Sequence, residues 1–436
     1  MERCVTRTSA WPGPGEGTGP SSNLVVRSST MVVGRSASTI LRLASVIAGS
    51  SHPGDIERVF AYDAGNMASD STTSSLRWRL ESDAPDSLFP TEALVERHVG
   101  TGEYRGLEFY EVAAKRVINE VPAASRMPFS YTINAYRGCS HACVWCFARP
   151  THQYLGLNTG EDFDRKIVVK VNAVERVRSE VASPKWSGAH IAMGTNTDPY
   201  QKAEGKYHLT RGIIGVLGAA HNPFSILTKS TLVLRDLDVL TAAAARTDVR
   251  LNLSIGTLDR KVWRLTEPGT PPPDKRVEAV RRINDAGIPC GVLIAPIVPG
   301  LSDSPDQLRA VVDACVGAGA ESISAIPLHL RPGVREHYLA WLEANRPDLL
   351  PLYEQRFTGR NGPRSYQPKA VAEALSAQVL GMVRDAERRA GGRRRAHVVD
   401  SGDGDRRRIL AEQGIADPTP PPDVSPAPPQ QLGLDI

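Results

Sequence analysis

Three of the chain's six cysteines lie close together, in the stretch CSHACVWC. They are Cys139, Cys143 and Cys146, and their spacing is C-x3-C-x2-C. Cysteine thiolates bind soft metals, and three thiolates this close in sequence can converge on one metal centre. A structural zinc ion takes four ligands, so the pattern raises the question of what fills the fourth position.

The other cysteines are poor candidates for a fourth ligand. Cys4 lies in a segment without periodic pattern, whereas Cys290 and Cys315 lie in an apolar strand and an apolar helix, where a small core residue is expected. A zinc site could instead recruit His141 or His152, although His141 lies inside the tight loop between two of the cysteines. A [4Fe–4S] cluster fits better, because three irons take cysteines and the fourth is left open for an exogenous ligand.

Composition describes an ordinary globular protein. The 436-residue chain is 41% hydrophobic and 23% charged, which is enough for a sizeable core. Its formal net charge is only +4, so overall charge does not indicate a nucleic-acid-binding protein. We find no apolar run that could span a membrane and no secretory cleavage region. The sequence therefore predicts a cytoplasmic protein, in which clustered cysteines bind metal rather than form disulfides.

Six short apolar runs alternate with helical patterns through the middle of the chain. The predicted strands span residues 130–138, 190–195, 224–229, 249–256, 289–298 and 321–330. The predicted helices between them span residues 209–221, 234–246, 274–287 and 304–319. Nearly all-apolar strands are typical of parallel sheets buried on both faces. Six β-α units favour an α/β fold with a partial (β/α)6 barrel, whose chemistry lies at the C-terminal ends of the strands.

The composition shifts along the chain suggest domain boundaries. We predict a disordered N-terminal extension over residues 1–75, a lead-in segment over 76–124 and the barrel over 125–345. A helical segment packed on the barrel follows over 346–390, and a disordered basic and proline-rich tail over 391–436. The composition of the first segment also leads to the hypothesis that translation starts further along, near LRWRLESD.

The cysteine loop resembles that of the radical S-adenosylmethionine (radical SAM) enzymes. Their signature is C-x3-C-x2-C after the first strand of a partial (β/α)6 barrel, typically with an aromatic residue before the third cysteine, here Trp145. The resemblance covers residues 125–345 and implies a [4Fe–4S] cluster whose open iron binds S-adenosylmethionine. It further implies reductive cleavage of S-adenosylmethionine to a 5′-deoxyadenosyl radical that abstracts hydrogen from a substrate, with an electron donor such as flavodoxin or ferredoxin.

A finer resemblance is to the spore photoproduct lyase-like branch. The segment AMGTNTDPYQKAE is similar to that branch's T-x-D-x-Y segment, and ILTKS and LSIGTLD end the third and fourth strands. The resemblance places the cofactor's carboxylate on Lys229 and Ser254, an ammonium and a hydroxyl that could hold it with charge-assisted hydrogen bonds. The lyase carries a hydrogen-donating cysteine after its second strand, whereas GTNTDPY has none, and Thr195 is the nearest equivalent. That departure puts repair of spore photoproduct by the lyase's route in doubt.

Polar residues after the second strand are the candidates for the substrate side. Asp198 and Tyr200 are the predicted catalytic residues, and Gln201 and Glu204 follow in the same loop. The alternative for Asp198 is turn chemistry, since Asp-Pro commonly begins a turn, and Glu204 could be a solvated side chain. The proline-stiffened stretch EPGTPPPDKR is a hypothetical lid over the active site.

His329 and Arg331 in PLHLRPG follow the sixth strand and are expected at the same face of the barrel. Arg331 could bind an anionic group of a substrate or form a structural ion pair. His329 is more often a packed histidine than a catalyst.

These observations predict a radical SAM enzyme, lyase-like or transferase, that acts on an unknown substrate. Within the same chemistry, the alternative is a nucleic-acid lyase or modification enzyme, which rests on the branch resemblance and the basic tail. Fold-level analogy does not transfer a substrate. Two alternatives come from other classes: a zinc-stabilised binding module, and a protein that binds a cluster for electron transfer without catalysis.

Overall fold

The computed structural model describes residues 94–122, 125 and 127–391. Apart from residue 391, the two predicted terminal extensions therefore lie outside the described residues. Cys4 and the hypothetical translation start lie outside them as well.

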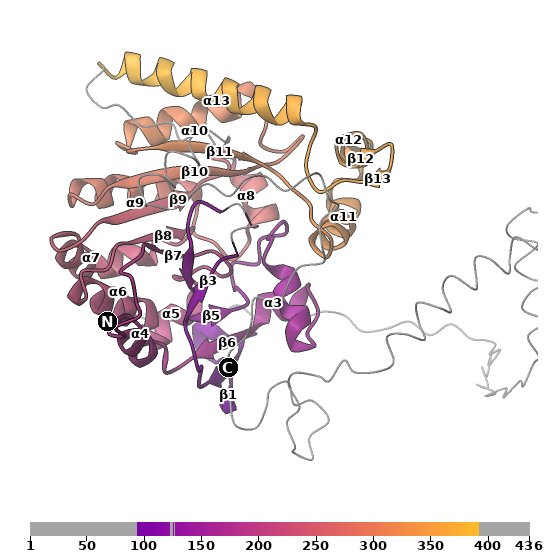
Figure 1. The fold of residues 1–436 in the computed structure, drawn as a ribbon. Coiled ribbons are helices and arrows are strands. Elements are labelled where there is room, and N and C mark those ends of the chain that lie inside the picture. Colours follow the sequence, from indigo (N-terminus) through magenta and orange to yellow (C-terminus); the bar gives the residue numbers. More distant parts are fainter. Residues whose placement is uncertain (1–93, 123–124, 126, 392–436) are drawn as a thin grey trace, which may run out of the picture. The chain divides into compact units, whose positions relative to one another are not determined.

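Six parallel strands form the main sheet, and each lies within one of the six apolar runs. They are β4 (Tyr131–Ile133), β7 (Ile191–Met193), β8 (Phe224–Thr228), β9 (Val249–Ser254), β10 (Cys290–Ile297) and β11 (Ile323–Pro327). The strands follow one another in chain order across the sheet (Figure 1). On its other side β4 pairs with the antiparallel strand β3 (Ile118–Glu120), so β11 and β4 do not meet. The barrel is thus open, and the predicted partial (β/α)6 fold is confirmed.

The helices predicted between the strands are present with similar bounds. They are α6 (Leu209–Ala219), α7 (Leu237–Ala244), α9 (Pro273–Asp285) and α10 (Pro305–Gly317). Their starts follow from local chemistry: α10 begins with a proline, and the Ser304 side chain accepts a hydrogen bond from the Gln307 backbone N–H. Shorter helical segments lie between the other elements. These are α3 (Glu161–Arg165), α4 (Ala173–Val181), α5 (Lys202–Tyr207), α8 (Arg260–Thr266), and the 3-10 turns η1 (Gly102–Tyr104), η3 (Arg149–Leu155) and η4 (Thr231–Asp236).

The main apolar core lies between these strands and helices. Strand β7 is buried at all three positions, which matches a strand covered on both faces. Helix α6 buries Ile213, Ile214 and Leu217, which recur at helical spacing and face the sheet. Cys290 and Cys315 are fully buried in the same core, so their predicted role as small core residues is confirmed.

A second sheet of four strands was not predicted. Its order is β1-β2-β6-β5, formed by β1 (Leu94–Val99), β2 (Glu108–Val112), β5 (Tyr136–Arg137) and β6 (Lys166–Lys170). Strand β6 is the β-branched run KIVVK, which lies in the sequence between the first two barrel strands. Strand β5 pairs with β6 and leads directly into Cys139, so this sheet supports the start of the cysteine loop.

The segment after the barrel is mostly helical and includes a short hairpin. Its elements are α11 (Val334–Asn345), η5 (Pro347–Leu349), α12 (Leu350–Phe357), β12 (Thr358–Gly359), β13 (Gly362–Pro363) and α13 (Lys369–Arg389). Helix α13 lies along α10 and β11 and covers the outside of the last strand (Figure 1). Tyr338, Tyr353 and Phe357 form a second apolar cluster with Val144 and Trp145 of the cysteine loop.

Within the described part of the chain, we find no helix with the length and apolar character that crossing a membrane requires.

Gly194 directly after β7 offers a test of the strand-end geometry. Its φ is +93°, and an ideal Cβ at this position would lie 2.0 Å from the Leu227 carbonyl oxygen of β8. We expect Gly194→Ala to destabilise the protein by about 2 kcal/mol or more, because both the backbone and the contact are strained.

Denaturant unfolding of the metal-free protein measures this change. Gly215→Ala is the matched control, since Gly215 is exposed on α6 with nothing within 4 Å of the added methyl. Equal denaturant midpoints for Gly194→Ala and Gly215→Ala would contradict the close approach of β7 and β8.

Candidate active site

A cavity of about 200 Å³ lies at the C-terminal ends of the barrel strands. It brings together residues that lie up to 190 positions apart in the sequence. The predicted site residues that line it are Cys139, Cys143, Trp145, Cys146, Thr195, Asp198, Lys229, Ser254 and His329. The expectation that the chemistry gathers at this end of the barrel agrees with this cavity.

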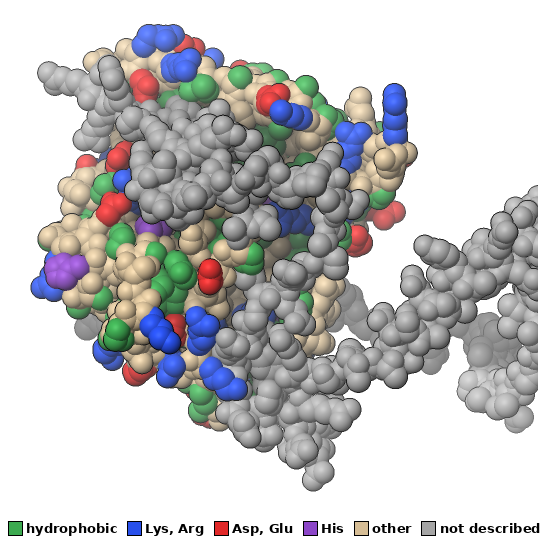
Figure 2. Space-filling view, viewed as in Figure 1, with side chains coloured by type: hydrophobic (Ala, Val, Ile, Leu, Met, Phe, Trp, Pro, Cys, Tyr) green, Lys and Arg blue, Asp and Glu red, His purple; other side chains and the backbone are tan. Residues whose placement is uncertain are grey.

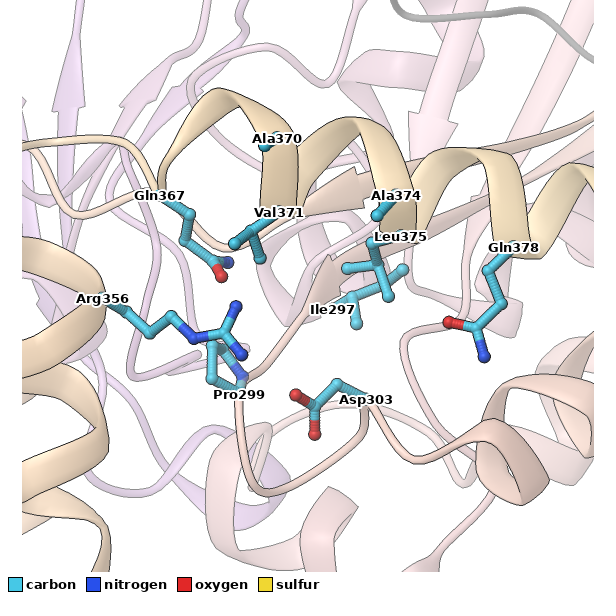
Figure 3. Close-up of a pocket in the computed structure, with 10 residues that line it drawn as sticks. All are labelled: Ile297, Pro299, Asp303, Arg356, Gln367, Ala370, Val371, Ala374, Leu375 and Gln378. Carbon is cyan, nitrogen blue, oxygen red and sulfur yellow. The ribbon is translucent and has the colours of Figure 1, made fainter.

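A second cavity, of about 420 Å³, lies outside the barrel, between the first turns of α13, helix α12 and the loop after β10. Figure 3 shows the side chains of Asp303, Arg356 and Gln367 directed toward it. No site residue predicted from the sequence lines this cavity. We therefore locate the candidate active site in the cavity at the strand ends.

The cysteine loop is held in shape by a buried arginine. Arg149 is fully buried and donates from Nε and Nη2 to the Cys143 carbonyl oxygen at 3.1 and 2.9 Å. Its Nη2 also pairs with Asp164 at 2.8 Å, and Nη1 donates to the Thr159 carbonyl oxygen at 2.9 Å. Because one rigid guanidinium joins these groups, the loop is fixed by the protein itself.

Gln201 and Thr197 hold the loop from the other side. Thr197 Oγ1 donates to the Gly138 carbonyl oxygen at 2.6 Å, and Gln201 Nε2 donates to the same oxygen at 2.9 Å. Gln201 Oε1 accepts the Ser140 backbone N–H at 3.0 Å. Gln201 was expected to face substrate or cofactor, and the structure instead places it under the cysteine loop.

The expectation that Glu204 lies at the substrate side or is solvated is also wrong. Glu204 is neither solvated nor at the substrate side, because it is completely buried and pairs with Arg235 at 3.0 Å. The Tyr136 hydroxyl donates to it as well. A buried ion pair of this kind fastens α5 to the segment after β8 and to β5 beside the cysteines.

The two predicted catalytic residues lie in different environments. Asp198 lines the cavity, where it accepts from the Thr228 hydroxyl at 2.6 Å and from the Lys229 backbone N–H at 2.7 Å. Tyr200 is 1% exposed within the apolar core and does not line the cavity, so this placement gives no support to a catalytic role for it.

Asp198 is held in its ionised form. Burial acts to raise the pKa of its carboxyl, but His141 beside it at 3.3 Å and the two hydrogen bonds outweigh burial and lower the pKa below its ordinary value. A carboxylate with a lowered pKa that already accepts several hydrogen bonds is a weak general base. The geometry therefore makes Asp198 an anchor of the strand end.

Lys229 and Ser254 meet at adjacent strand ends, as the resemblance implied. Lys229 Nζ lies 2.7 Å from Ser254 Oγ and 3.2 Å from the Ala295 carbonyl oxygen. It also lies 3.1 Å from Glu267 Oε1, a partner that sequence reasoning missed. Glu267 follows helix α8 rather than a strand end, and no motif marks it in the sequence.

The stretch expected to be a lid begins in a segment packed against the cysteine loop. The Thr266 carbonyl oxygen accepts the Val144 backbone N–H at 3.1 Å, and the Gly269 N–H donates to the His141 carbonyl oxygen at 3.1 Å. An ideal Cβ at Gly269 would lie 2.1 Å from the Ser140 carbonyl oxygen. Residues 267–270 therefore support the cysteine loop, and these contacts give no support to the lid hypothesis for them.

The three thiols fit a multinuclear cluster better than a single zinc ion. Thiolates around one tetrahedral zinc lie about 3.8 Å apart, as the Zn–S length of about 2.3 Å requires. Among the described residues, the three cysteine sulfur atoms do not all lie within 4.8 Å of one another, with or without a histidine. The one group of three possible metal ligands in this part of the chain that meets this distance is Glu96, His98 and Glu111. His152 Nε2 lies 3.0 Å from the Lys166 carbonyl oxygen, away from the cavity.

Burial disfavours the thiolate form of two of the three cysteines when no metal is bound. Burial raises the pKa of Cys143 well above its ordinary value and that of Cys146 to about 11. Thiolate ligation at neutral pH therefore needs compensating positive charge, which bound iron provides. The donor set thus fits a cluster held by Cys139, Cys143 and Cys146.

Aromatic side chains surround the mouth of the cavity. The ring of His329 stacks on that of Tyr366 with centroids 5.6 Å apart, and the ring centroid of Phe147 lies 6.2 Å from that of His329. Phe147 and Tyr366 are 46% and 54% exposed. Arg331 donates to the Tyr366 hydroxyl at 2.8 Å. The mouth therefore presents flat rings and a positive charge to the solvent.

An open parallel barrel with three thiols, a lysine and a serine at its strand ends is characteristic of a cofactor-dependent radical enzyme. The sequence model of the radical SAM superfamily matches residues 133–311. The chain belongs to the radical SAM superfamily. Its members use a [4Fe–4S] cluster and S-adenosylmethionine, which confirms the cofactors predicted from the sequence.

Two relatives and one solved structure illustrate the similarity. The chain is 42% identical over 287 residues to a protein of Mycobacterium tuberculosis, a match that covers 66% of this chain and 83% of that protein. It is 31% identical over 199 residues to a protein of Methanocaldococcus jannaschii, a match that covers 45% of this chain and 70% of that protein. A structure of spore photoproduct lyase complexed with dinucleoside spore photoproduct has a TM-score of 0.47 at 18% sequence identity. The match covers 64% of this chain and 79% of the lyase chain.

Gly269 provides a test of how the cysteine loop is supported. We expect Gly269→Ala to lower the iron content of anaerobically reconstituted protein by about half or more, because a Cβ would push the Ser140 carbonyl away. Iron and sulfide analysis measures the effect, with Gly215→Ala as the control. Full iron loading of the Gly269 variant would contradict the packing described here.

Proposed function

We propose that this chain is a radical SAM enzyme that binds a [4Fe–4S] cluster through Cys139, Cys143 and Cys146 and cleaves S-adenosylmethionine reductively. The observation that carries the proposal is the convergence of these three thiols with Lys229 and Ser254 in one cavity. When bound, the cluster and S-adenosylmethionine would supply the radical that begins chemistry on a substrate.

The chain's own residues position the cofactors. Lys229 Nζ and Ser254 Oγ, 2.7 Å apart, present an ammonium and a hydroxyl to one carboxylate. Trp145 is 7% exposed and packs against the C-terminal helices, so it anchors the loop that precedes Cys146 and covers one wall of the cavity. Asp198 fixes the Lys229 backbone and thereby the direction in which this side chain enters the site.

The remaining assignments follow from the same proposal. We place the catalytic core at residues 125–345, with reduction by a donor such as flavodoxin or ferredoxin, in the cytoplasm. The described cysteines are all free, as thiols in a reducing compartment are. Among the described residues that line the cavity, the cysteines are the three assigned to the cluster, so a protein thiol that returns hydrogen to a product radical is absent from this lining.

A nucleic-acid substrate is the second candidate, and the cavity mouth supports it. The exposed rings of Phe147 and Tyr366 could stack on bases, and Arg331 lies beside them. Residues 329–330 pair with residues 365–366, which follow β13. Arg360 and Arg364, a few residues earlier in the sequence, are exposed. Figure 2 shows Lys and Arg side chains projecting at the corner formed by α12, β12 and β13.

Replacing one cluster ligand tests the function directly. We expect Cys143→Ala to abolish formation of 5′-deoxyadenosine, because the cluster would lose one of its three thiolates. The assay is anaerobic, with chemical reductant and product quantified by liquid chromatography. Cys290→Ala is the matched control, since Cys290 is a buried cysteine of the core, outside the cavity.

Retained activity in Cys143→Ala would remove the cluster assignment. A colourless wild-type protein with one zinc per chain would favour the binding module. A cluster that S-adenosylmethionine does not affect would favour electron transfer.

Lys229→Ala tests the carboxylate assignment separately. Loss of a hydrogen bond between charged groups should weaken binding of S-adenosylmethionine by about tenfold or more. Isothermal titration of the cluster-loaded protein measures the affinity, with the exposed Lys202→Ala as control. If both variants bind with wild-type affinity, Lys229 does not hold the cofactor.

A further inference from the structure

Lys229 is surrounded by oxygen atoms before any ligand reaches it. Its ammonium has three N–H donors, and three oxygens lie within 3.2 Å: Ser254 Oγ, the Ala295 carbonyl and Glu267 Oε1. The Ser254 and Ala295 contacts are hydrogen bonds, whereas Glu267 Oε1 has no hydrogen-bond partner among the described residues and its contact is an ion pair. A cofactor carboxylate would therefore compete with these three oxygens for the ammonium.

The Ala295 carbonyl is the partner that can be replaced most easily. It is the most distant of the three, at 3.2 Å from Lys229 Nζ. It also accepts from the Ser254 hydroxyl at 2.8 Å, so it keeps a donor when Lys229 turns away. Ser254 Oγ and Glu267 Oε1 can then stay in contact with Lys229 and fix its direction.

Glu267 is itself held by a buried arginine. Arg276 Nη2 contacts Glu267 Oε2 at 2.6 Å, and the two side chains are 1% and 4% exposed. Arg276 also donates to the Ser254 carbonyl oxygen at 3.0 Å and to the Pro271 carbonyl oxygen at 2.9 Å. The same guanidinium thus fastens both Glu267 and the backbone of Ser254.

The charges of this group leave an excess of one positive charge. Lys229 and Arg276 each carry +1 and Glu267 carries −1, since burial acts to raise the pKa of Glu267 but Arg276 and Lys229 bring it to about 2. Arg276 therefore offsets the repulsion that Glu267 alone would exert on an incoming carboxylate. A buried pair of this kind is weak evidence for stability, because an apolar replacement is often as stable.

We propose that Glu267 is a positioning residue for S-adenosylmethionine, which holds the Lys229 ammonium toward the cofactor carboxylate while Arg276 holds Glu267. The inference rests on the proposed function and adds two residues to the site that no strand-end motif contains. Glu267 also adjoins the segment that hydrogen-bonds to the cysteine loop, through the Thr266 carbonyl oxygen. One short segment thus links the cluster ligands to the carboxylate site.

A double-mutant cycle tests the proposal. S-adenosylmethionine affinity is measured by anaerobic titration calorimetry on the cluster-loaded wild type, Glu267→Ala, Lys229→Ala and the double variant. We expect Glu267→Ala to weaken binding by about tenfold in the wild-type background and by less than about twofold in the Lys229→Ala background. Non-additivity of this size shows that Glu267 acts through Lys229, which a merely structural role would not produce.

The control is Glu278→Ala, which removes an exposed glutamate that pairs with Arg281 on α9. If Glu267→Ala loads less cluster than wild type, the same cycle is run with Glu267→Gln, which preserves the side-chain volume. Equal effects of the Glu267 change in the two backgrounds, or no effect, overturn the inference and leave the proposed function intact. Absence of binding by the wild type overturns the proposed function and the inference together.

Discussion

The structure depends on a cysteine loop that must keep three thiols at a fixed separation in a buried place. Its backbone oxygens are held by Arg149, Thr197, Gln201 and Gly269, and two of its amides donate to Phe163 of α3 and to Thr266 at the end of α8. These partners come from η3, the loop between β7 and α5, α3, and α8 with the segment after it, so correct folding of the whole domain is what shapes the loop. Preorganisation of this kind is what the proposed cluster site requires of its three ligands.

Buried charge is the second constraint on the site, and each charged group contacts a group of opposite charge, with Lys229 and Arg276 sharing Glu267. Asp198 faces His141, and Lys229 lies between Glu267 and the polar edge of β9 and β10. Arg276 then compensates Glu267. An isolated charge in this place would be costly, whereas a connected set leaves one net positive charge beside the predicted carboxylate position. The arrangement connects the geometry of the barrel to the binding of a zwitterionic cofactor.

The sequence predicted the parts of this architecture that local patterns encode. The six barrel strands, the four helices between them, the three cysteines and the core role of Cys290 and Cys315 follow from apolar periodicity and spacing. The second sheet did not, because β6 pairs with β2 and β5, two short strands that lie far before it in the sequence. Gln201, Glu204 and Glu267 were misjudged or missed, since a polar residue in a loop is normally exposed and only tertiary contacts reveal that these three are buried.

The central claim is that three cysteines hold a [4Fe–4S] cluster with one iron reserved for S-adenosylmethionine. Electron paramagnetic resonance of the reduced, anaerobically reconstituted protein tests it most directly. The account predicts about four irons per chain and a reduced-cluster spectrum whose g-values change when S-adenosylmethionine is added. A spectrum that is the same with and without S-adenosylmethionine, or a protein that binds zinc in place of iron, would contradict it.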